Sequence, residues 1–188
     1  MICYTSIVNN LLIYCKYKKE GENIPVFRKP ELNDSPAIFD LINHCKPLDL
    51  NSRYAYMLVC TYFRNTSIVY ENSKEVRGFI SGYLDPRTKN TLFIWQVALH
   101  TSSRGKGVAL QMLRNLLNRE DLDHIEYIET TISPSNKASQ NLFHRLTSDL
   151  KAEINVKPYF AKELFGEEAH EDEELYRIGP LNNKKGEL

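Results

Sequence analysis

Hydrophobic and polar positions alternate with two different spacings along the chain, and each spacing predicts a kind of element. Short runs rich in β-branched and aromatic residues predict strands at 26–28, 66–71, 76–85, 91–99, 124–133, 153–160 and 174–179. Apolar residues three or four positions apart predict helices from about 35, at 53–63, at 108–118 and at 134–146. Strands that first pair locally and then alternate with helices indicate a mixed sheet covered on both faces.

The two N-terminal helices illustrate how the pattern is interpreted. Asp34 or Ser35 is a candidate N-cap, with Pro36 in the first turn. The core positions that follow are Ile38, Leu41 and Ile42. In the second helix we expect a buried face made by Tyr54, Leu58 and Tyr62.

A turn with two glycines and two cations separates the apolar strand 91–99 from the next helix. It consists of Arg104, Gly105, Lys106, Gly107, Val108 and Ala109. Glycine lets the backbone approach a ligand closely, and the first turn of a helix offers unpaired N–H groups and a positive dipole end. A strand, this turn and a helix together predict a cradle for an anion, most often a phosphate.

Composition narrows the class of protein without identifying it. Apolar residues make up 42% and charged residues 26%, as in an ordinary soluble domain. Lys and Arg together number 24, as do Asp and Glu, so nothing favours nucleic acid or an anionic membrane as a partner. The four cysteines match no zinc or redox spacing, and we expect free thiols and no metal.

Length and the chain ends suggest one domain. We expect a poorly packed extension at 1–25, a domain at 26–181 and a polar tail at 182–188. The opening apolar stretch is interrupted by Asn9 and Asn10, and its lysines follow it, which is wrong for a secretion signal. It is also too short to span a bilayer, so a cytoplasmic location is expected.

The turn resembles the acyl-CoA motif Arg/Gln-x-x-Gly-x-Gly/Ala of the GNAT acetyltransferase superfamily, with Arg104, Gly107 and Ala109 at the matching positions. The resemblance implies an α/β (α+β) GNAT fold, with a mixed, mostly antiparallel central sheet of six to seven strands flanked by about four helices. It also implies acetyl-CoA as co-substrate. The residues implied to hold it are Val97, Leu99, Arg104, Gly105, Lys106, Gly107, Val108, Ala109, Asn136 and Ser139.

A second motif of the superfamily, Asn-x-x-Ala-x-x-Leu-Tyr, matches Asn136, Ser139 and Leu142 but ends on Phe143. The tyrosine of that motif is often assigned as the acid that protonates the CoA thiolate. A phenyl ring donates no proton. Water can protonate the thiolate instead, so chemistry is not excluded by this departure.

Longer stretches resemble one branch of the superfamily, the enzymes that acetylate L-2,4-diaminobutyrate in ectoine synthesis. These stretches include "LDLNSRYAYMLVCTYF", "LFIWQVALH" and "HEDEELYRIG", and the resemblance covers about 26–181. It implies transfer to the γ-amine of diaminobutyrate in a ternary complex, and a homodimer. The alternatives are acetylation of another small amine, such as a polyamine, or a non-catalytic acetyl-CoA-binding module, which Phe143 favours.

Two residues are implied to be catalytic. On its own, Glu129 would be a solvated strand carboxylate. The resemblance places it at the cofactor cleft, where it either binds an ammonium group or accepts the amine proton through water. His170 would ordinarily face solvent in its acidic turn. The resemblance makes it a contact for the acceptor and a proton relay, a role that imidazole groups often take in enzymes.

The implied acceptor is a zwitterion, so its site needs acids for the ammonium and donors for the carboxylate. Asp49 is either a helix cap or a ligand of a substrate amine. Arg53 or Tyr54 is expected to bind the carboxylate. The alternative is that Arg53 is a solvated arginine and Tyr54 a core tyrosine. The remaining candidates for substrate contact are Trp95 as a pocket wall rather than core, the Thr130 hydroxyl, and Asn136, which is also a helix cap.

Overall fold

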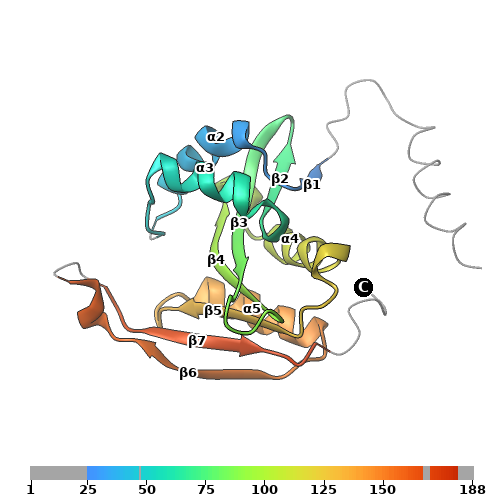
Figure 1. Ribbon diagram of the computed structural model, residues 1–188. Helices are drawn as coiled ribbons and strands as arrows, with labels where there is room; N and C mark the ends of the chain where they lie inside the picture. The colour runs from blue at the N-terminus through green and yellow to red at the C-terminus, as the bar shows by residue number, and fades with distance from the viewer. Residues whose placement is uncertain (1–24, 47, 167–169, 182–188) are drawn as a thin grey trace, which may run out of the picture.

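A seven-stranded sheet runs through the protein in a computed structural model that describes residues 25–46, 48–166 and 170–181 (Figure 1). The strand order is β1-β2-β3-β4-β5-β7-β6. The strands are β1 (Val26–Arg28), β2 (Ile68–Asn72), β3 (Glu75–Leu84), β4 (Thr91–Leu99), β5 (Tyr127–Ile132), β6 (Ile154–Phe160) and β7 (Glu173–Ile178). Apart from Pro25, the predicted extension and tail lie outside the described residues.

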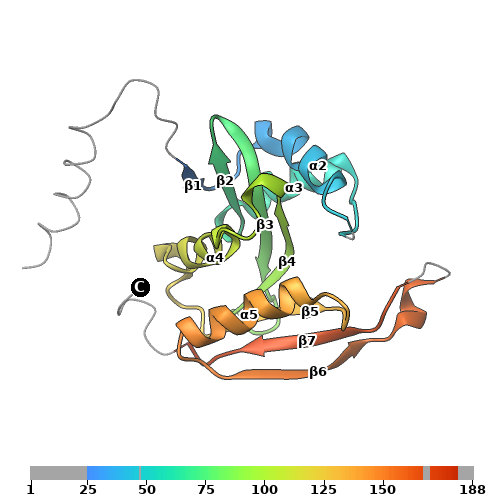
Figure 2. The same ribbon diagram turned by 180° about the vertical axis from the view of Figure 1, so that it is seen from behind.

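Four α-helices of the described chain cover the sheet from two sides (Figures 1 and 2). They are α2 (Ser35–Asn43), α3 (Arg53–Tyr62), α4 (Val108–Leu117) and α5 (Lys137–Asp149). The buried side chains of α2 and α3 form one core against β2 to β4, and those of α4 and α5 form another on the opposite face. The predicted mixed sheet and its covering helices are confirmed. No helix in the described ranges is long and apolar enough to cross a membrane.

The buried face of α3 differs from the one that the spacing predicts. Tyr56, Val59 and Cys60 are buried, whereas Tyr54 and Tyr62 are exposed. Aromatic residues occupy both sides of this helix, so the apolar period alone does not decide which side packs. Packing against β3 and β4 selects the Tyr56 side.

β4 and β5 form the parallel pair of a sheet whose other described pairs are antiparallel. Their register contains three residue pairs, Thr91–Tyr127, Leu92–Ile128 and Phe93–Glu129. Beyond Phe93 the two strands separate, as Figure 2 shows. The gap lies in the middle of the sheet.

A β-bulge in β4 controls what the gap exposes. Ser81 pairs with Gln96 and Gly82 pairs with Ile94, so Trp95 has no partner in β3. In an antiparallel pair every second residue hydrogen-bonds to the neighbouring strand. Before the bulge the carbonyl of Thr91 accepts from Asp85 N at 2.9 Å, and after it His100 N donates to Arg77 O at 2.9 Å. The β4 residues whose backbone groups hydrogen-bond to β3 therefore have odd numbers before the bulge and even numbers after it.

The bulge therefore turns two backbone units of β4 toward β5. Val97 and Leu99 direct their N–H and C=O groups into the gap instead of toward β3. The carbonyl of Leu99 accepts hydrogen bonds from Arg104 Nε at 3.0 Å and Cys45 Sγ at 3.3 Å. Because β5 does not pair with this edge of β4 beyond Phe93, an extended ligand can add there.

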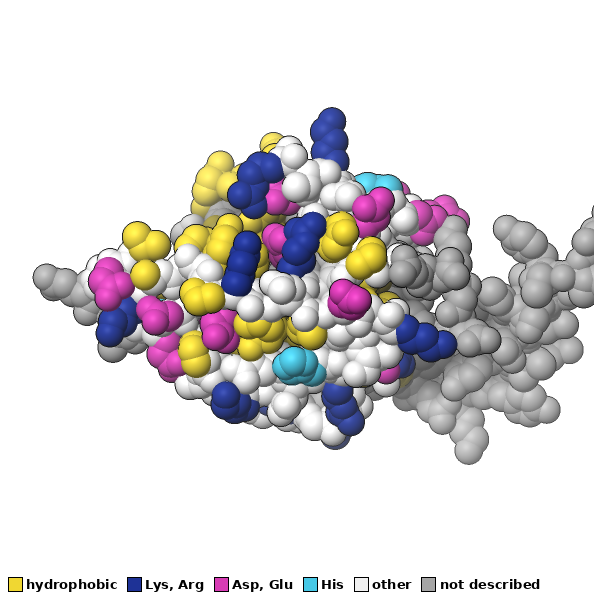
Figure 3. All heavy atoms as spheres, turned by 90° about the horizontal axis from the view of Figure 1, so that it is seen from below, with side chains coloured by type: hydrophobic (Ala, Val, Ile, Leu, Met, Phe, Trp, Pro, Cys, Tyr) yellow, Lys and Arg dark blue, Asp and Glu magenta, His cyan; other side chains and the backbone are white. Residues whose placement is uncertain are grey.

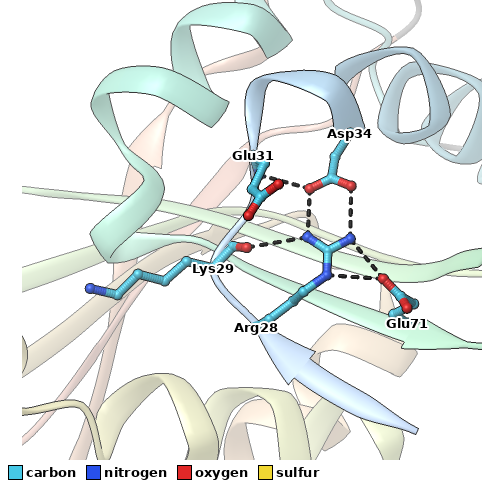
Figure 4. A network of polar contacts seen from close by, with 5 residues as sticks. All are labelled: Arg28, Lys29, Glu31, Asp34 and Glu71. Atoms are coloured by element: carbon cyan, nitrogen blue, oxygen red, sulfur yellow. Dashed lines mark hydrogen bonds and ion pairs between the residues drawn. The ribbon is translucent and has the colours of Figure 1, made fainter. Parts of the chain in front are cut away.

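Arg28 ties the N-terminal strand to its surroundings (Figure 4). Its Nη1 lies 2.6 Å from Asp34 Oδ2 and its Nη2 lies 2.8 Å from Glu71 Oε2, while Glu31 N donates to Asp34 Oδ2 at 2.7 Å. Burial alone would raise the pKa of Asp34, but the hydrogen bonds from Arg28 and the Glu31 backbone outweigh it and lower that pKa. The network fixes β1 against β2 and the start of α2.

Asp34→Asn is expected to lower the free energy of unfolding by about 1–3 kcal/mol at pH 7, because a partly buried charge-assisted pair is lost. The native pKa of Asp34 lies below its unfolded value, so this stabilisation is complete above about pH 4 and is lost as the pH falls through the native pKa. Urea unfolding at several pH values measures the difference, which should shrink on acidification.

Asp121→Asn is the matched control. Its carboxylate lies 2.6 Å from Lys29 Nζ on the surface, so the loss should stay below about 1 kcal/mol. Equal losses for both variants at pH 7 would contradict a special role for the Arg28 network.

Candidate active site

The gap between β4 and β5 opens into a cleft of 1810 Å³. One part of its wall comes from the turn before α4 and the start of α5. Another part comes from the α2–α3 loop, the β3–β4 hairpin and the β6–β7 segment. The two parts differ in charge, and the difference divides the cleft into an anion-binding end and an acidic end.

The anion-binding end is built by the glycine turn that the sequence singles out. Gly105 and Gly107 have φ angles of +71° and +75°, and a Cβ on either would meet no protein atom within 4 Å. Positive φ is the reason for glycine here, and the space above the turn is open. Within the described ranges, no hydrogen-bond acceptor is found for the backbone N–H groups of 105–109. These N–H groups and the N-terminal dipole of α4 suit a phosphate.

The start of α5 completes this end. Asn136 Oδ1 accepts a hydrogen bond from Ser139 N at 3.1 Å and so caps the helix, as one of its two expected roles requires. Asn136, Lys137 and Ser139 all line the cleft. Arg104 lines the cleft as well. Two cations, Arg104 and Lys137, and the N-termini of α4 and α5 therefore surround the same space.

A row of side chains crosses the sheet at the acidic end. The register pairs Tyr83 with Phe93, Phe93 with Glu129, and Glu129 with Arg177. Directly paired residues share a face, and Leu92 and Ile94 beside Phe93 belong to the core under α4 and α5. The row therefore lies on the opposite face, where no helix covers β5, β7 and β6 in Figure 1.

Glu129 is 7% exposed and lines the cleft. Arg177 Nη1 donates a hydrogen bond to its Oε1. Thr130, its neighbour on β5, pairs with the core residue Tyr176 and does not line the cleft. Successive strand residues alternate between faces, so Thr131 occupies the place expected for Thr130.

His170 and Asp49 come together although they are far apart in the sequence. His170 Nε2 lies 4.0 Å from Asp49 Oδ2 and 3.9 Å from Glu173 Oε1. Since a carbonyl only accepts, the 2.6 Å contact with Glu171 O makes Nδ1 the protonated nitrogen. The imidazole stacks on Phe165 with ring centroids 3.7 Å apart. Nε2 is thus held toward two carboxylates.

Gln96 holds the loop that carries Asp49. Its Nε2 donates to Asp49 O at 2.8 Å, and its Oε1 accepts from Tyr56 Oη at 3.4 Å. Because Trp95 is the bulge residue, it and Gln96 both line the cleft. Trp95 is 46% exposed and so forms a wall of the cleft instead of packing in the core, as expected from the resemblance.

Arg53 and Tyr54 lie outside the cleft, contrary to expectation. The Arg53 guanidinium stacks 3.9 Å above the Phe39 ring and lies 3.6 Å from Asp40 Oδ1. Tyr54 is 68% exposed. Both side chains leave the first turn of α3 on its outer surface, because Tyr56 takes the inner one.

Several cleft residues carry no signal in the sequence. They are Tyr83, Asp85, Arg87, Tyr159 and Glu173. Hydrogen bonds from Arg87 lower the pKa of Asp85 to about 2, so this pair is charged at neutral pH. Burial raises the pKa of Tyr83, so its phenol keeps its proton. Each occupies an ordinary strand or hairpin position, and only the β4–β5 separation brings them to one site.

Phe143 is buried in the core between α5 and the sheet and does not line the cleft. In the part of the chain that the structure describes, no group of three or more His, Cys, Asp or Glu side chains could hold a metal ion. Cys45 and Cys60 are free and buried, and Cys3 and Cys15 lie outside the described residues.

Comparison with known proteins agrees with the fold and the cleft. The model of the acetyltransferase (GNAT) family matches residues 35–147. An L-2,4-diaminobutyric acid acetyltransferase from Virgibacillus pantothenticus is 49% identical over 158 residues, which cover 82% of this chain and 99% of that protein. One from Vibrio cholerae is 44% identical over 158 residues, with 84% and 91% covered.

A solved structure is similar over nearly the same range. It is the diaminobutyrate acetyltransferase EctA from Paenibacillus lautus in complex with its substrate L-2,4-diaminobutyric acid and coenzyme A. The TM-score is 0.83 at 40% identity, and the match covers 86% of this chain and 98% of that one.

Gln96→Met is expected to lower the free energy of unfolding by about 1–3 kcal/mol, because Asp49 O and Tyr56 Oη lose their partner. Amide exchange in the loop 48–52 should also become faster. Gln140→Met is the control, since Gln140 Nε2 donates to Pro134 O at 3.0 Å in a solvent-exposed hydrogen bond. If Gln96→Met costs no more than this control and leaves exchange unchanged, Gln96 does not hold the loop.

Proposed function

The chain belongs to the acetyltransferase (GNAT) family, and on that basis we propose that it transfers the acetyl group of acetyl-CoA to the γ-amine of L-2,4-diaminobutyrate. One observation carries the proposal: a single cleft joins a turn of unpaired N–H groups to a pocket of acids. A long anionic cofactor and a small diamine need these two environments side by side.

The cofactor is assigned to the anion-binding end. The N–H groups of Gly105 to Ala109 would hold its pyrophosphate, with Arg104 as one additional charge-assisted contact. The pantetheine arm would lie in the β4–β5 gap and pair with Val97 and Leu99 like an added strand. The gap has room for a strand because β4 and β5 pair over three residues only.

The acceptor is assigned to the acidic end. Asp49 and Glu129 would bind its amino groups, His170 would lie between substrate and carboxylates, and Trp95 would form the wall. The acceptor carboxylate then needs a cation other than Arg53. Arg87 lines this part of the cleft, and we assign the carboxylate to it, in competition with its pair with Asp85.

The reaction needs a neutral amine. An ammonium group with a pKa near 10 costs about 3–4 kcal/mol to deprotonate at pH 7.5. In the proposed step the γ-nitrogen attacks the thioester carbonyl carbon, its proton passes to Glu129, and the carbon–sulfur bond breaks. The buried Phe143 cannot supply the proton that the leaving thiolate takes, so we assign that proton to water.

A cytoplasmic homodimer serving ectoine synthesis is the setting we propose. Exposed apolar residues on and beside the edge strand β6 support an association of two copies: Val156, Tyr159, Phe160 and Leu164. Figure 3 shows hydrophobic side chains interspersed with charged ones on the face seen from below. The even balance of charge offers no surface for nucleic acid or for an anionic membrane.

A thiol-release assay tests the proposed function. Purified protein and acetyl-CoA are mixed with diaminobutyrate, with spermidine or with no acceptor, and free CoA is measured. We expect release that depends on diaminobutyrate. Faster release with spermidine would identify a polyamine enzyme, and acetyl-CoA binding without release would identify a binding module.

Gly107→Ala tests the cofactor turn separately. A Cβ at this position enters the open space above the turn, so acetyl-CoA affinity should fall at least tenfold. The left-handed conformation should cost about 1–2 kcal/mol of stability and leave the protein folded. Calorimetry measures the affinity and urea unfolding the stability. A folded variant with unchanged affinity would rule out the turn as the pyrophosphate site.

A further inference from the structure

Arg177 lies beside Glu129 on the neighbouring strand β7. The two residues are partners in the β5–β7 ladder, and Arg177 Nη1 donates a hydrogen bond to Glu129 Oε1. The guanidinium carbon is 3.9 Å from the centre of the Tyr127 ring, two positions before Glu129 on β5. A hydrogen bond and a stacking contact thus fix the guanidinium relative to the carboxylate.

The carboxylate presents one oxygen to the protein and one to the cleft. Among the described residues, Glu129 Oε2 has no hydrogen-bond partner, and it is not one of the fully buried unpartnered atoms. Glu129 lines the cleft, whereas Arg177 does not. Arg177 is therefore placed to act on a bound acceptor through Glu129.

Negative charge predominates in the part of the cleft that Glu129 lines. The titratable or charged groups there are Lys46, Asp49, Tyr83, Asp85, Arg87, Tyr159, His170, Glu171 and Glu173. Carboxylates outnumber cations in this set, and Arg87 is already paired with Asp85. Arg177 is the cation that contacts Glu129 directly and offsets this excess of negative charge.

We propose that Arg177 is a positioning residue that keeps Glu129 ionised and aims its Oε2 at the acceptor amine. This rests on the proposed function. The first proton leaves the γ-ammonium for Oε2, and the freed nitrogen lone pair forms the bond to the thioester carbon while the carbonyl π electrons move onto oxygen. When these electrons re-form the carbonyl, the carbon–sulfur bond breaks with its electron pair on the thiolate. The nitrogen gives its second proton to water, and the thiolate takes a proton from water. Arg177 takes part in none of these steps. Its role is to hold Glu129 ionised and oriented before they begin.

The pH dependence of kcat tests this role. In Arg177→Met the acid limb should move to higher pH by about one to two units, because the cation that favours the carboxylate is gone. At pH 7 kcat should fall about tenfold or more, with the KM for acetyl-CoA unchanged. Arg177→Lys should move the acid limb most of the way back to its wild-type pH, because it restores the charge. It should not restore all of kcat, because an ammonium group lacks the guanidinium fork.

A matched arginine separates this effect from a loss of stability. Arg114, whose side chain is about as exposed as that of Arg177, has its Nη2 2.6 Å from Asp149 Oδ2 between α4 and α5, on the other side of the sheet. Arg114→Met should lose stability without moving the limb. If the acid limb of kcat lies at the same pH in Arg177→Met as in Arg114→Met, Arg177 is merely structural and the proposal is wrong.

A double-mutant cycle gives a second test that does not need the pH profile. If Arg177 acts through Glu129, Glu129→Gln with Arg177→Met should be no slower than Glu129→Gln alone. Additive losses would overturn the proposal. Should the wild type turn over a different amine, the proposed substrate fails, but the same variants assayed with that amine still decide the role of Arg177.

Discussion

The separation of β4 from β5 is the constraint on which the rest of the site depends. Two parallel strands that share three residue pairs leave an open backbone edge in the middle of a sheet, where unpaired groups are normally costly. The bulge at Trp95 decides which groups that edge presents, because it turns Val97 and Leu99 away from β3. It also brings Trp95 and Gln96 to the cleft in succession. One extra residue in β4 therefore serves both the cofactor edge and the acceptor wall.

The two ends of the cleft are built in different ways. The anion-binding end is local, because a strand, a glycine turn and a helix follow one another in the chain, and backbone N–H groups provide most of its binding capacity. The acidic end collects Asp49, Glu129 and His170 from three distant segments, and secondary contacts hold each of them: Gln96 for the Asp49 loop, Arg177 for Glu129 and Phe165 for His170. In the proposed function, the charge difference between the ends would orient two substrates that meet near the bulge.

This difference explains how far the sequence could predict the site. Hydrophobic spacing locates every described strand and helix to within a few residues, and the glycine turn is evident from its residues alone. The bulge leaves no trace in the apolar pattern, so the face of each residue around it could not be assigned. The sequence predicts Thr130 as a substrate contact, but its neighbour Thr131 lines the cleft. Arg53 and Tyr54, also predicted to contact the substrate, lie on the outside of α3. Arg177 becomes meaningful only once its cross-strand partner is known.

The central claim is that the cofactor occupies the β4–β5 gap as an added strand, and amide hydrogen exchange at β4 tests it most directly. The N–H groups of Val97 and Leu99 face the gap, so acetyl-CoA should slow their exchange strongly. Ala98, whose N–H faces β3, should change much less. Equal exchange at Val97 and Leu99 with and without saturating acetyl-CoA would contradict the account.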